Sequence, residues 1–373
     1  MRYFIFECKK LLFTKRFLIA LAIIIGAISL LFFRNLTFQD YAREQVIKEH
    51  SRIVKFHRDK DYALYNHLTE NDGDQNALEQ KERNEPILQK ALIWSTSYVQ
   101  GEPWQEVLHK ENEYLLSLDP QIELEEAIPL SLEEIKNSLI LNDELLKREI
   151  PPEFENYSIA TPNFLKQVVD FFVMYGSLVI ILILLSDLLS GEFESRTILF
   201  QFTQPINRAN IIFSKFAAAF IMYAIILLSI ILTAYALANF LGEKGDFNYP
   251  IFVEQAGELQ AIAISDYLLY ALLANFVLGL LIISLYLFFS VLTKHTLLTL
   301  FTVAGISISA ALLSTIFKGK LMALLNPFRF LLSMEFITMQ TNQNWYDGLI
   351  ASGLFTITFL FIASQLIKKS KVE

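Results

Sequence analysis

The chain has 373 residues, of which 54% are hydrophobic and 19% are charged, and its formal net charge is −8. Soluble domains carry roughly 25% charged residues, so this composition favours a membrane protein. The single cysteine, Cys8, excludes an internal disulfide.

Residues 1–16 predict a short amphipathic helix in the inner membrane interface, and residues 17–33 predict the first transmembrane helix. Basic residues precede the apolar run, as they do in a signal peptide. The run ends in Phe32-Phe33, however, without a small-x-small cleavage site. We therefore interpret it as a retained membrane helix.

Residues 34–163 form a polar insert, which we predict to be an extracellular helical domain. It contains 26 acidic and 14 basic residues, and long domains cross a membrane largely regardless of their charge. Ser131 and Glu134 have the spacing of a capping box, and apolar residues including Leu132 and Ile135 follow on one helical face. Without disulfides, packing alone must hold this domain together.

Residues 164–373 contain five further apolar runs, which predict a five-helix transmembrane bundle. A spanning helix needs about 20 mostly apolar residues, within a range of about 17–25. Phe171–Ser186 is short, but residues 164–169 extend it. The predicted fold class is therefore an all-α membrane protein with six transmembrane helices. The six uncharged runs are Phe17–Phe33, Phe171–Ser186, Phe216–Gly242, Tyr267–Thr293, Thr296–Phe317 and Gly348–Ile367.

The distribution of Lys and Arg predicts that both ends of the chain are cytoplasmic. Basic residues near span ends tend to stay on the cytoplasmic side, and the chain has them before the first span and again at Lys368 and Lys369. An even number of spans agrees with this. The acidic insert and the acidic loop Glu243–Asp266 are then outside, and residues 187–215 are inside.

The sequence contains no pattern that is typical of an enzyme. The phosphate-binding pattern G-x-x-x-x-G-K-[ST] is absent. No charged residue lies in the middle of a span, since Asp170, Asp187 and Asp266 are at span ends, and this disfavours an ion-coupled carrier. The histidines lack zinc-ligand spacing and are interpreted as solvated surface residues: His50, His57, His67, His109 and His295.

The loop between the second and third spans is compact and mixed in character, and residues 190–215 read SGEFESRTILFQFTQPINRANIIFSK. Two acids follow the second span, an amphipathic turn or two continues to Phe200, and Pro205 breaks the helix. A plain connector rarely needs 29 residues, 187–215, with acids so close to the lipid. We interpret the loop as a docking surface for a partner that supplies energy.

This stretch resembles the corresponding loop in permease subunits of ABC transporters of the ABC-2 (type V exporter-like) class. That loop follows the order small-x-E, G-T, L, P-x-[ST]-R and K. Arg196 stands where the family usually has glycine before Thr197, and Asn207 replaces a small hydroxyl residue before Arg208. The layout of nearly the whole chain is also similar, from the interfacial helix and six spans to the large outside domain.

The resemblance implies a permease without its own nucleotide-binding domain. A separate cytosolic ATPase subunit would bind ATP and magnesium, and the loop would be a coupling helix resting in a groove of that subunit. Two permease subunits would pass the substrate between them. No cofactor, metal or nucleic acid is expected on this chain. The residues expected to couple to the ATPase are Glu192, Glu194, Arg196, Thr197, Pro205, Arg208 and Lys215.

Residues 318–347 predict a further element on the outer side. The run LMALLNPFRFLLSMEFITM is too apolar for a free loop and too interrupted to span the membrane. The family layout suggests a re-entrant segment, which is tolerated where protein covers it. A helix on the membrane surface is the alternative.

The predicted function is that of the permease of an ATP-driven exporter in the cell membrane, moving a hydrophobic or amphipathic substrate (peptide, lipid-like or drug). A membrane-bound sensor or scaffold with an extracellular ligand-binding domain is the alternative. Small residues in Ala217–Ala219 and Ala304–Ala311 let helices approach closely. Each cluster packs helices either within one subunit or between two.

Overall fold

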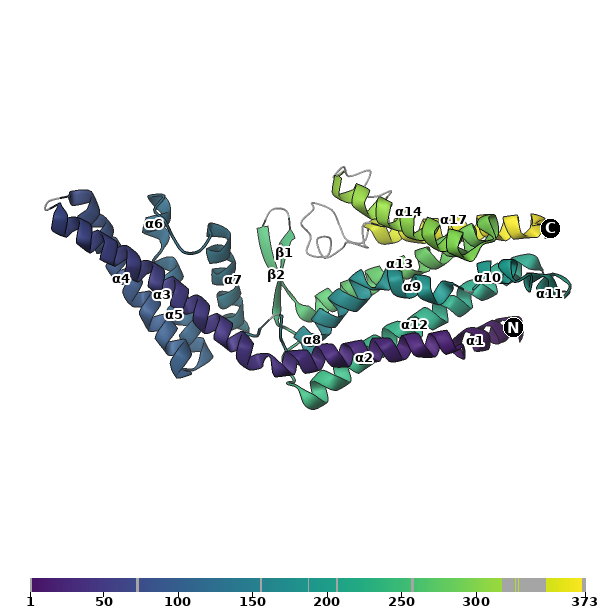
Figure 1. Cartoon of the computed structure of the whole chain (residues 1–373), viewed down its shortest axis with the longest axis horizontal. Coiled ribbons are helices and arrows are strands. Elements are labelled where there is room, and N and C mark those ends of the chain that lie inside the picture. The colour runs from purple at the N-terminus through teal and green to yellow at the C-terminus, as the bar shows by residue number, and fades with distance from the viewer. Residues whose placement is uncertain are drawn as a thin grey trace. The chain divides into compact units, whose positions relative to one another are not determined.

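The structure is a computed structural model that describes residues 2–370 except 72–73, 155, 187, 206, 256–257, 317–325, 327 and 329–346 (Figure 1). The chain divides into two compact units. The first consists of residues 1–33, 159–247 and 251–373, and the second of residues 34–158 and 248–250. The predicted outer segment 318–347 lies almost entirely outside the described residues.

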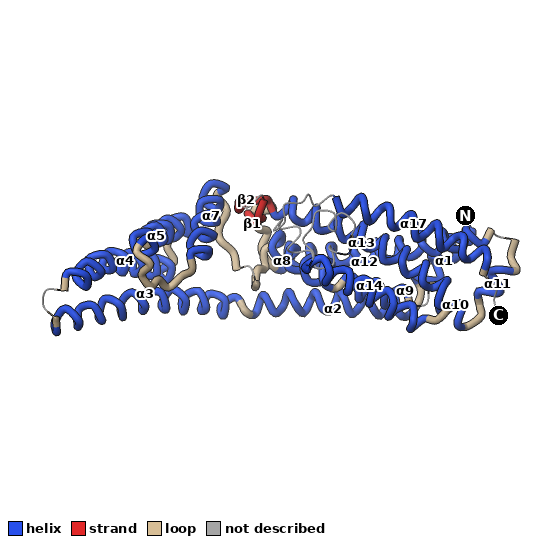
Figure 2. The backbone as a smooth tube through the Cα atoms, turned by 90° about the horizontal axis from the view of Figure 1, so that it is seen from above, coloured by secondary structure: helices blue, strands red, loops and turns tan. Residues whose placement is uncertain are grey.

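The first unit is a helical bundle with one small sheet. Its long helices run side by side, and the start of α1, the segment α10–α11 and the end of α17 lie at the same end of the bundle (Figures 1 and 2). The elements are α1 Arg2–Leu12, α2 Lys15–Thr37, α8 Thr161–Val168, the π-helix η1 Val169–Tyr175, α9 Ser177–Leu185, α10 Ser190–Glu194, α11 Ile198–Phe202, α12 Arg208–Leu241, β1 Pro250–Gln255, β2 Glu258–Ala263, α13 Ile264–Thr293, α14 Thr296–Ile316 and α17 Asp347–Lys369.

Five of the described helices are long and apolar enough to cross a membrane. A sixth candidate is the bent pair Thr161–Met174 and Ser177–Glu194, whose halves meet at 49°. The six predicted spans therefore match the structure if this pair counts as one crossing. The straight candidates are Lys15–Thr37, Arg208–Leu241, Ile264–Thr293, Thr296–Leu313 and Leu349–Lys369.

α13 is the central helix of the bundle, and it packs against α9, α12, α14 and α17. In its most apolar stretch 61% of the residues are buried, against 22% in α2 and in α14. Gly279 lets α12 approach, because a Cβ at this position would lie 2.2 Å from the ring of Tyr223. The apolar surface of α2 and α14 is largely exposed, as lipid-facing helices require.

Polar side chains join the bent pair to α12 and α13. The Asn275 amide donates to the carbonyl of Val173 in the π-helix and also bonds the Tyr223 hydroxyl. Asp170 accepts from the hydroxyl of Tyr267 and pairs with Lys166 at 3.1 Å. The uncharged run Phe171–Ser186 predicts that Asp170 lies at a span end. The helix begins earlier, at Thr161, and Asp170 is buried.

The all-α prediction fits the structure except for one two-stranded sheet, formed by β1 and β2 before α13. The sequence pattern predicts only an acidic loop for this stretch. Ile251, Phe252 and Val253 have the β-branched and aromatic side chains that favour strands, and Val253 is 1% exposed. Only β1 and β2 form strands among the described residues.

The second unit is helical. The predicted capping box is confirmed, because Ser131 accepts from the Glu134 amide while the Glu134 carboxylate accepts from the Ser131 amide. Its core packs around Trp94 and Tyr114, whose rings stack at 5.4 Å. The helices are α3 Gln39–Glu70, α4 Gln75–Gln100, α5 Trp104–Leu116, α6 Asp119–Glu123 and α7 Leu132–Arg148.

Two of the five histidines are not solvated, which makes the surface interpretation wrong for them. His57 is 0% exposed, and its ring nitrogens bond Asn84 and Tyr114, both at 3.1 Å. His50 packs against Trp94, with ring centroids 4.0 Å apart. Both lie on one face of α3, seven residues apart, where helical periodicity brings them to the core.

We predict that acidification destabilises the second unit through His50. Burial lowers the pKa of His50 to about 4, whereas the unfolded chain takes up this proton near its ordinary pKa of about 6.5. Between these values the unfolded state binds more protons, so stability falls as the pH drops. Burial also lowers the pKa of His57. His50→Phe should reduce the loss of thermal stability between pH 6.5 and 4.5, followed by tryptophan fluorescence.

The matched control is Glu111→Gln. Burial raises the pKa of Glu111 to about 7, so the folded state keeps this proton to a higher pH than the unfolded state does. The contribution of Glu111 to stability is therefore present below its ordinary pKa and is lost as the pH rises toward 7. Glu111→Gln should therefore make the acid sensitivity steeper, opposite to His50→Phe. Identical pH profiles for the two variants and the unsubstituted chain would contradict this account.

Candidate functional site

The loop selected from the sequence folds into two short helices, α10 and α11, followed by the start of α12. Asn207 caps α12, because its side-chain oxygen accepts from the Ala209 amide at 3.1 Å. Pro205 is exposed and lies between α11 and α12. Of the seven predicted coupling residues, Glu192 and Lys215 form a buried group and Arg208 is half-buried. The exposed outer group consists of Glu194, Arg196, Thr197 and Pro205.

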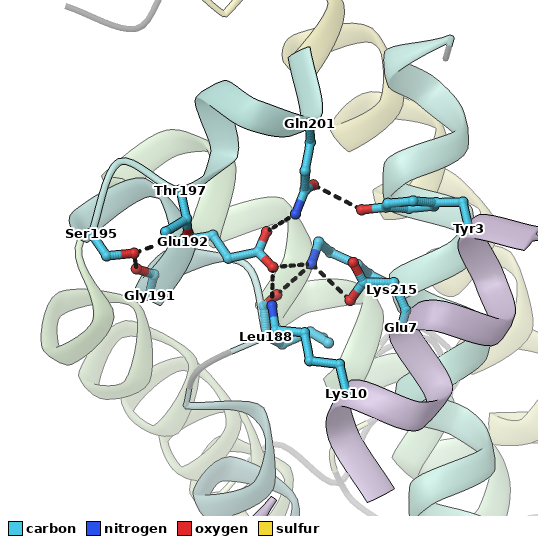
Figure 3. Close-up of polar contacts among 10 residues, drawn as sticks. All are labelled: Tyr3, Glu7, Lys10, Leu188, Gly191, Glu192, Ser195, Thr197, Gln201 and Lys215. Carbon is cyan, nitrogen blue, oxygen red and sulfur yellow. Dashed lines mark hydrogen bonds and ion pairs between the residues drawn. The ribbon is translucent and has the colours of Figure 1, made fainter. Parts of the chain in front are cut away.

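The buried group centres on Lys215, which is 0% exposed on α12 (Figure 3). Its ammonium donates to Glu192 Oε1 at 2.7 Å, to the carbonyl of Leu188 at 2.9 Å and to Glu7 Oε2 at 3.1 Å. These three acceptors match the three donors of a lysine. An unpaired charge in such a place costs several kcal/mol, so the three acceptors hold α12, α10 and α1 together.

A second set of contacts begins at Glu192, which is 3% exposed. Lys10 of α1 pairs with Glu192 Oε1, and Gln201 of α11 donates to Oε2 at 2.8 Å. The hydroxyl of Tyr3 then donates to Gln201 Oε1, also at 2.8 Å. The polar contacts therefore form a closed circuit from α1 through α11, α10 and α12 back to α1 (Figure 3). We call these six residues the anchor cluster: Tyr3, Glu7, Lys10, Glu192, Gln201 and Lys215.

The outer group lies on the exposed side of the same segment. Glu194 accepts from the backbone amide of Thr296 at 3.2 Å and lies 3.4 Å from His295. Thr197 is exposed and bonds Ser195 at 3.0 Å. These contacts stabilise the outer surface of the turn between α10 and α11.

Arg208 is half-buried at the start of α12. Its guanidinium donates to the carbonyl of Ser370 at 3.1 Å and lies 4.3 Å above the ring of Phe202. Arg208 thus ties the end of α11 to the residue that follows α17.

Arg196 has a left-handed backbone, with φ of +60°. This region costs about 1 kcal/mol or more for a residue with a Cβ, and glycine occupies it freely. The position is the one at which the resembling family usually has glycine. Arg196 therefore adopts a backbone conformation that favours glycine, and its side chain is exposed.

The contribution of α1 and the exposed apolar side chains of α11 were not predicted from the sequence. Tyr3, Glu7 and Lys10 follow one another at helical spacing, and a lone glutamate in an apolar and basic segment was the available signal. Phe200 is 73% exposed and Leu199 is 41% exposed, although they lie beside charged residues at the end of the bundle.

Among the described residues, no group of three or more His, Cys, Asp or Glu could hold a metal ion.

Removal of the central cation should be costly. In Lys215→Met, the carboxylates of Glu7 and Glu192 lose their shared partner, and breaking a buried ion pair in this way costs about 3–5 kcal/mol. We expect a clearly lower unfolding temperature in detergent. Lys9→Met removes an exposed charge from the same region and should change the unfolding temperature little. Equal unfolding temperatures for both variants would contradict the role of Lys215.

Comparison with known proteins gives one match. The family model described as ABC-2 family transporter protein matches residues 4–361, which is nearly the whole chain. Searches of curated proteins and of solved structures give no match. The matched region includes most of the bundle, the second unit and the segment α10–α11. The chain therefore belongs to the family of ABC-2 transporter proteins and is an ABC-2 type permease.

Proposed function

We propose that this chain is the permease subunit of an ATP-driven ABC exporter and that a separate ATPase subunit acts on it through α10–α11. The observation that carries the proposal is the combination of an exposed apolar tip with a buried anchor. Phe200 is 73% exposed, while Glu192 in the same segment is fixed to Lys215 at 2.7 Å. An exposed aromatic side chain on a segment held by buried contacts is the kind of group that forms the centre of a protein interface.

The outer group supplies the charged surroundings of this tip. Glu194 at the end of α10 and Arg196 in the turn that leads into α11 are both exposed. Charged residues at an interface rim guide association and fix the register of binding rather than adding much affinity. We assign these roles to Glu194, Arg196 and Thr197, whereas Glu192 and Lys215 act from within the permease by holding the segment in place.

The proposed cargo is hydrophobic or amphipathic, such as a peptide, a lipid-like molecule or a drug. Support comes from the charges inside the bundle, because Asp170 and Lys215 are both engaged by other side chains. An ion path through the membrane needs ionisable groups that face a hydrated route. The buried charges described here instead bind helices together.

The proposed location is the cell membrane, with both termini, α10 and α11 in the cytoplasm. The start of α1, the segment α10–α11 and the end of α17 lie at one end of the bundle (Figure 2). Basic residues Lys9, Lys10, Lys368 and Lys369 lie in the last turns of α1 and α17. Their charge favours the cytoplasmic side. We propose that the second unit is outside, because long domains cross a membrane largely regardless of their charge.

Phe200→Ala tests the docking site. An aromatic anchor contributes about 2 kcal/mol or more to an interface, which corresponds to roughly 30-fold in affinity. We expect the tagged permease to retain much less ATPase subunit after purification in mild detergent and to lose permease-dependent ATP hydrolysis.

The control is Phe240→Ala. Phe240 is 79% exposed at the other end of α12, so it matches Phe200 in type and exposure. This variant should retain the ATPase subunit. The docking proposal fails if Phe200→Ala retains as much ATPase as Phe240→Ala does.

We also propose that two permease subunits associate through α14. The alanines at Ala218 and Ala219 are buried within one chain, so this small-residue cluster packs helices internally. In the cluster on α14, Ala311 is also buried within the chain, whereas Gly305 is exposed and a Cβ built on it meets no atom within 4 Å. Small residues allow the close helix contacts that drive association in lipid, so α14 is available for a second subunit.

Crosslinking tests this seam. Single cysteines at Phe301, Gly305 and Leu312, in a chain with Cys8→Ser, should crosslink two permeases in the membrane. Val303 is 0% exposed and provides the control, since a cysteine at this position should not react between chains. Absence of crosslinks from all the exposed positions, together with one permease per purified particle, would rule out the dimer.

A further inference from the structure

α1 contributes three of the six residues of the anchor cluster, and all three come from one helical face. Tyr3, Glu7 and Lys10 are four and three residues apart, a spacing that aligns side chains along a helix. Each reaches a different partner helix: Tyr3 contacts α11, Glu7 contacts α12 and Lys10 contacts α10. The helix therefore touches every element of the coupling segment.

The depth of Glu7 distinguishes it from a surface ion-pair residue. Glu7 is 0% exposed, whereas Ile5 and Phe6 of the same helix are 46% and 58% exposed. A short helix that buries a carboxylate and exposes apolar side chains is oriented by the ion pair, because a buried carboxylate without its partner is strongly disfavoured. The contact with Lys215 at 3.1 Å thus sets the rotation of α1.

α1 is also joined closely to the first transmembrane helix. Only residues 13 and 14 separate α1 from α2, and the hydroxyl of Thr14 bonds at both ends of this joint. It donates to the carbonyl of Leu11 at 2.9 Å and accepts from the amide of Phe17 at 3.2 Å. A displacement of α1 is therefore passed to the start of α2 through a short, hydrogen-bonded connection.

We infer that α1 is a second arm of the coupling element and that Glu7 is the positioning residue that locks it to α10–α11. Force applied to α11 moves α10, α11 and α1 as one body, and α1 carries the movement to α2. This inference rests on the proposed function, because it takes α11 as the point at which the ATPase acts. A purely stabilising Glu7 would affect the amount of folded protein but not the relative movement of α1 and α11.

The experiment measures that movement in the complete complex of permease and ATPase. Spin labels are attached at Lys9→Cys on α1 and Thr203→Cys after α11, both exposed positions, in a chain with Cys8→Ser. A reference pair joins position 203 to Leu313→Cys on α14, whose side chain is 48% exposed. Pulsed electron paramagnetic resonance gives both distances without nucleotide and after trapping with ATP and vanadate.

With Glu7 intact, we expect the distance from position 9 to position 203 to stay constant between the two states while the reference distance changes. In Glu7→Gln, the distance between positions 9 and 203 should change when the complex is trapped with ATP and vanadate. Tyr3→Phe removes only the bond to Gln201 and should broaden the same distance to a smaller extent. Lys15→Gln, an exposed change at the start of α2, should behave as the intact chain does.

The outcomes separate the inference from the proposed function. If the reference distance responds to ATP but Glu7→Gln and Tyr3→Phe both keep the 9–203 distance constant, the inference is overturned and the proposed function stands. If the reference distance does not respond in the intact chain, the ATPase does not act through α11, and both fail. A shift of the 9–203 distance in Glu7→Gln but not in Lys15→Gln supports the inference.

Discussion

Lys215 carries a positive charge at a position on α12 that is 0% exposed, and the surrounding structure is arranged to satisfy it. Glu192 supplies one carboxylate from α10 and Glu7 supplies another from α1. Buried ion pairs contribute little net stability compared with apolar packing, but they are strongly destabilised when one partner is lost. Such a cluster therefore tolerates one arrangement of its helices and penalises others.

This constraint gives a short segment an unusual rigidity. α10 and α11 have five residues each, and isolated helices of this length are not stable in water. They hold their places because Glu192 and Gln201 are bonded into the anchor cluster and Arg208 ties the end of α11 to Ser370. Under the proposed function, a partner that acts on Phe200 would meet a segment bonded to α12 and α1 rather than a free loop.

Apolar periodicity and local signals accounted for much of the fold. The uncharged runs identified the spans, and the Ser131–Glu134 spacing identified the start of α7 because a capping box depends on local contacts. Local patterns did not reveal the bend between Met174 and Ser177. The carbonyl of Val173 beside that bend accepts a hydrogen bond from Asn275, which is far away in the sequence.

The candidate site also combines features that the local sequence reveals with contacts between distant residues that it does not reveal. The loop could be found because acids, bases and a proline interrupt long apolar runs. The partners of Lys215 could not be found from the sequence, because Glu7 lies 208 residues away and meets Lys215 only when α1 packs on α12. His50 and His57 were misjudged for a related reason: polar side chains usually lie outside, and their burial requires aromatic neighbours from other helices.

The central claim is that an ATPase subunit seats on the anchored α10–α11 segment. The most direct measurement is a cryo-electron microscopy structure of the permease with its ATPase subunit in lipid nanodiscs. The account predicts that Phe200 lies in a groove of the ATPase while Lys215 remains paired with Glu7 and Glu192. An ATPase bound elsewhere on the permease, with Phe200 facing lipid or solvent, would contradict it.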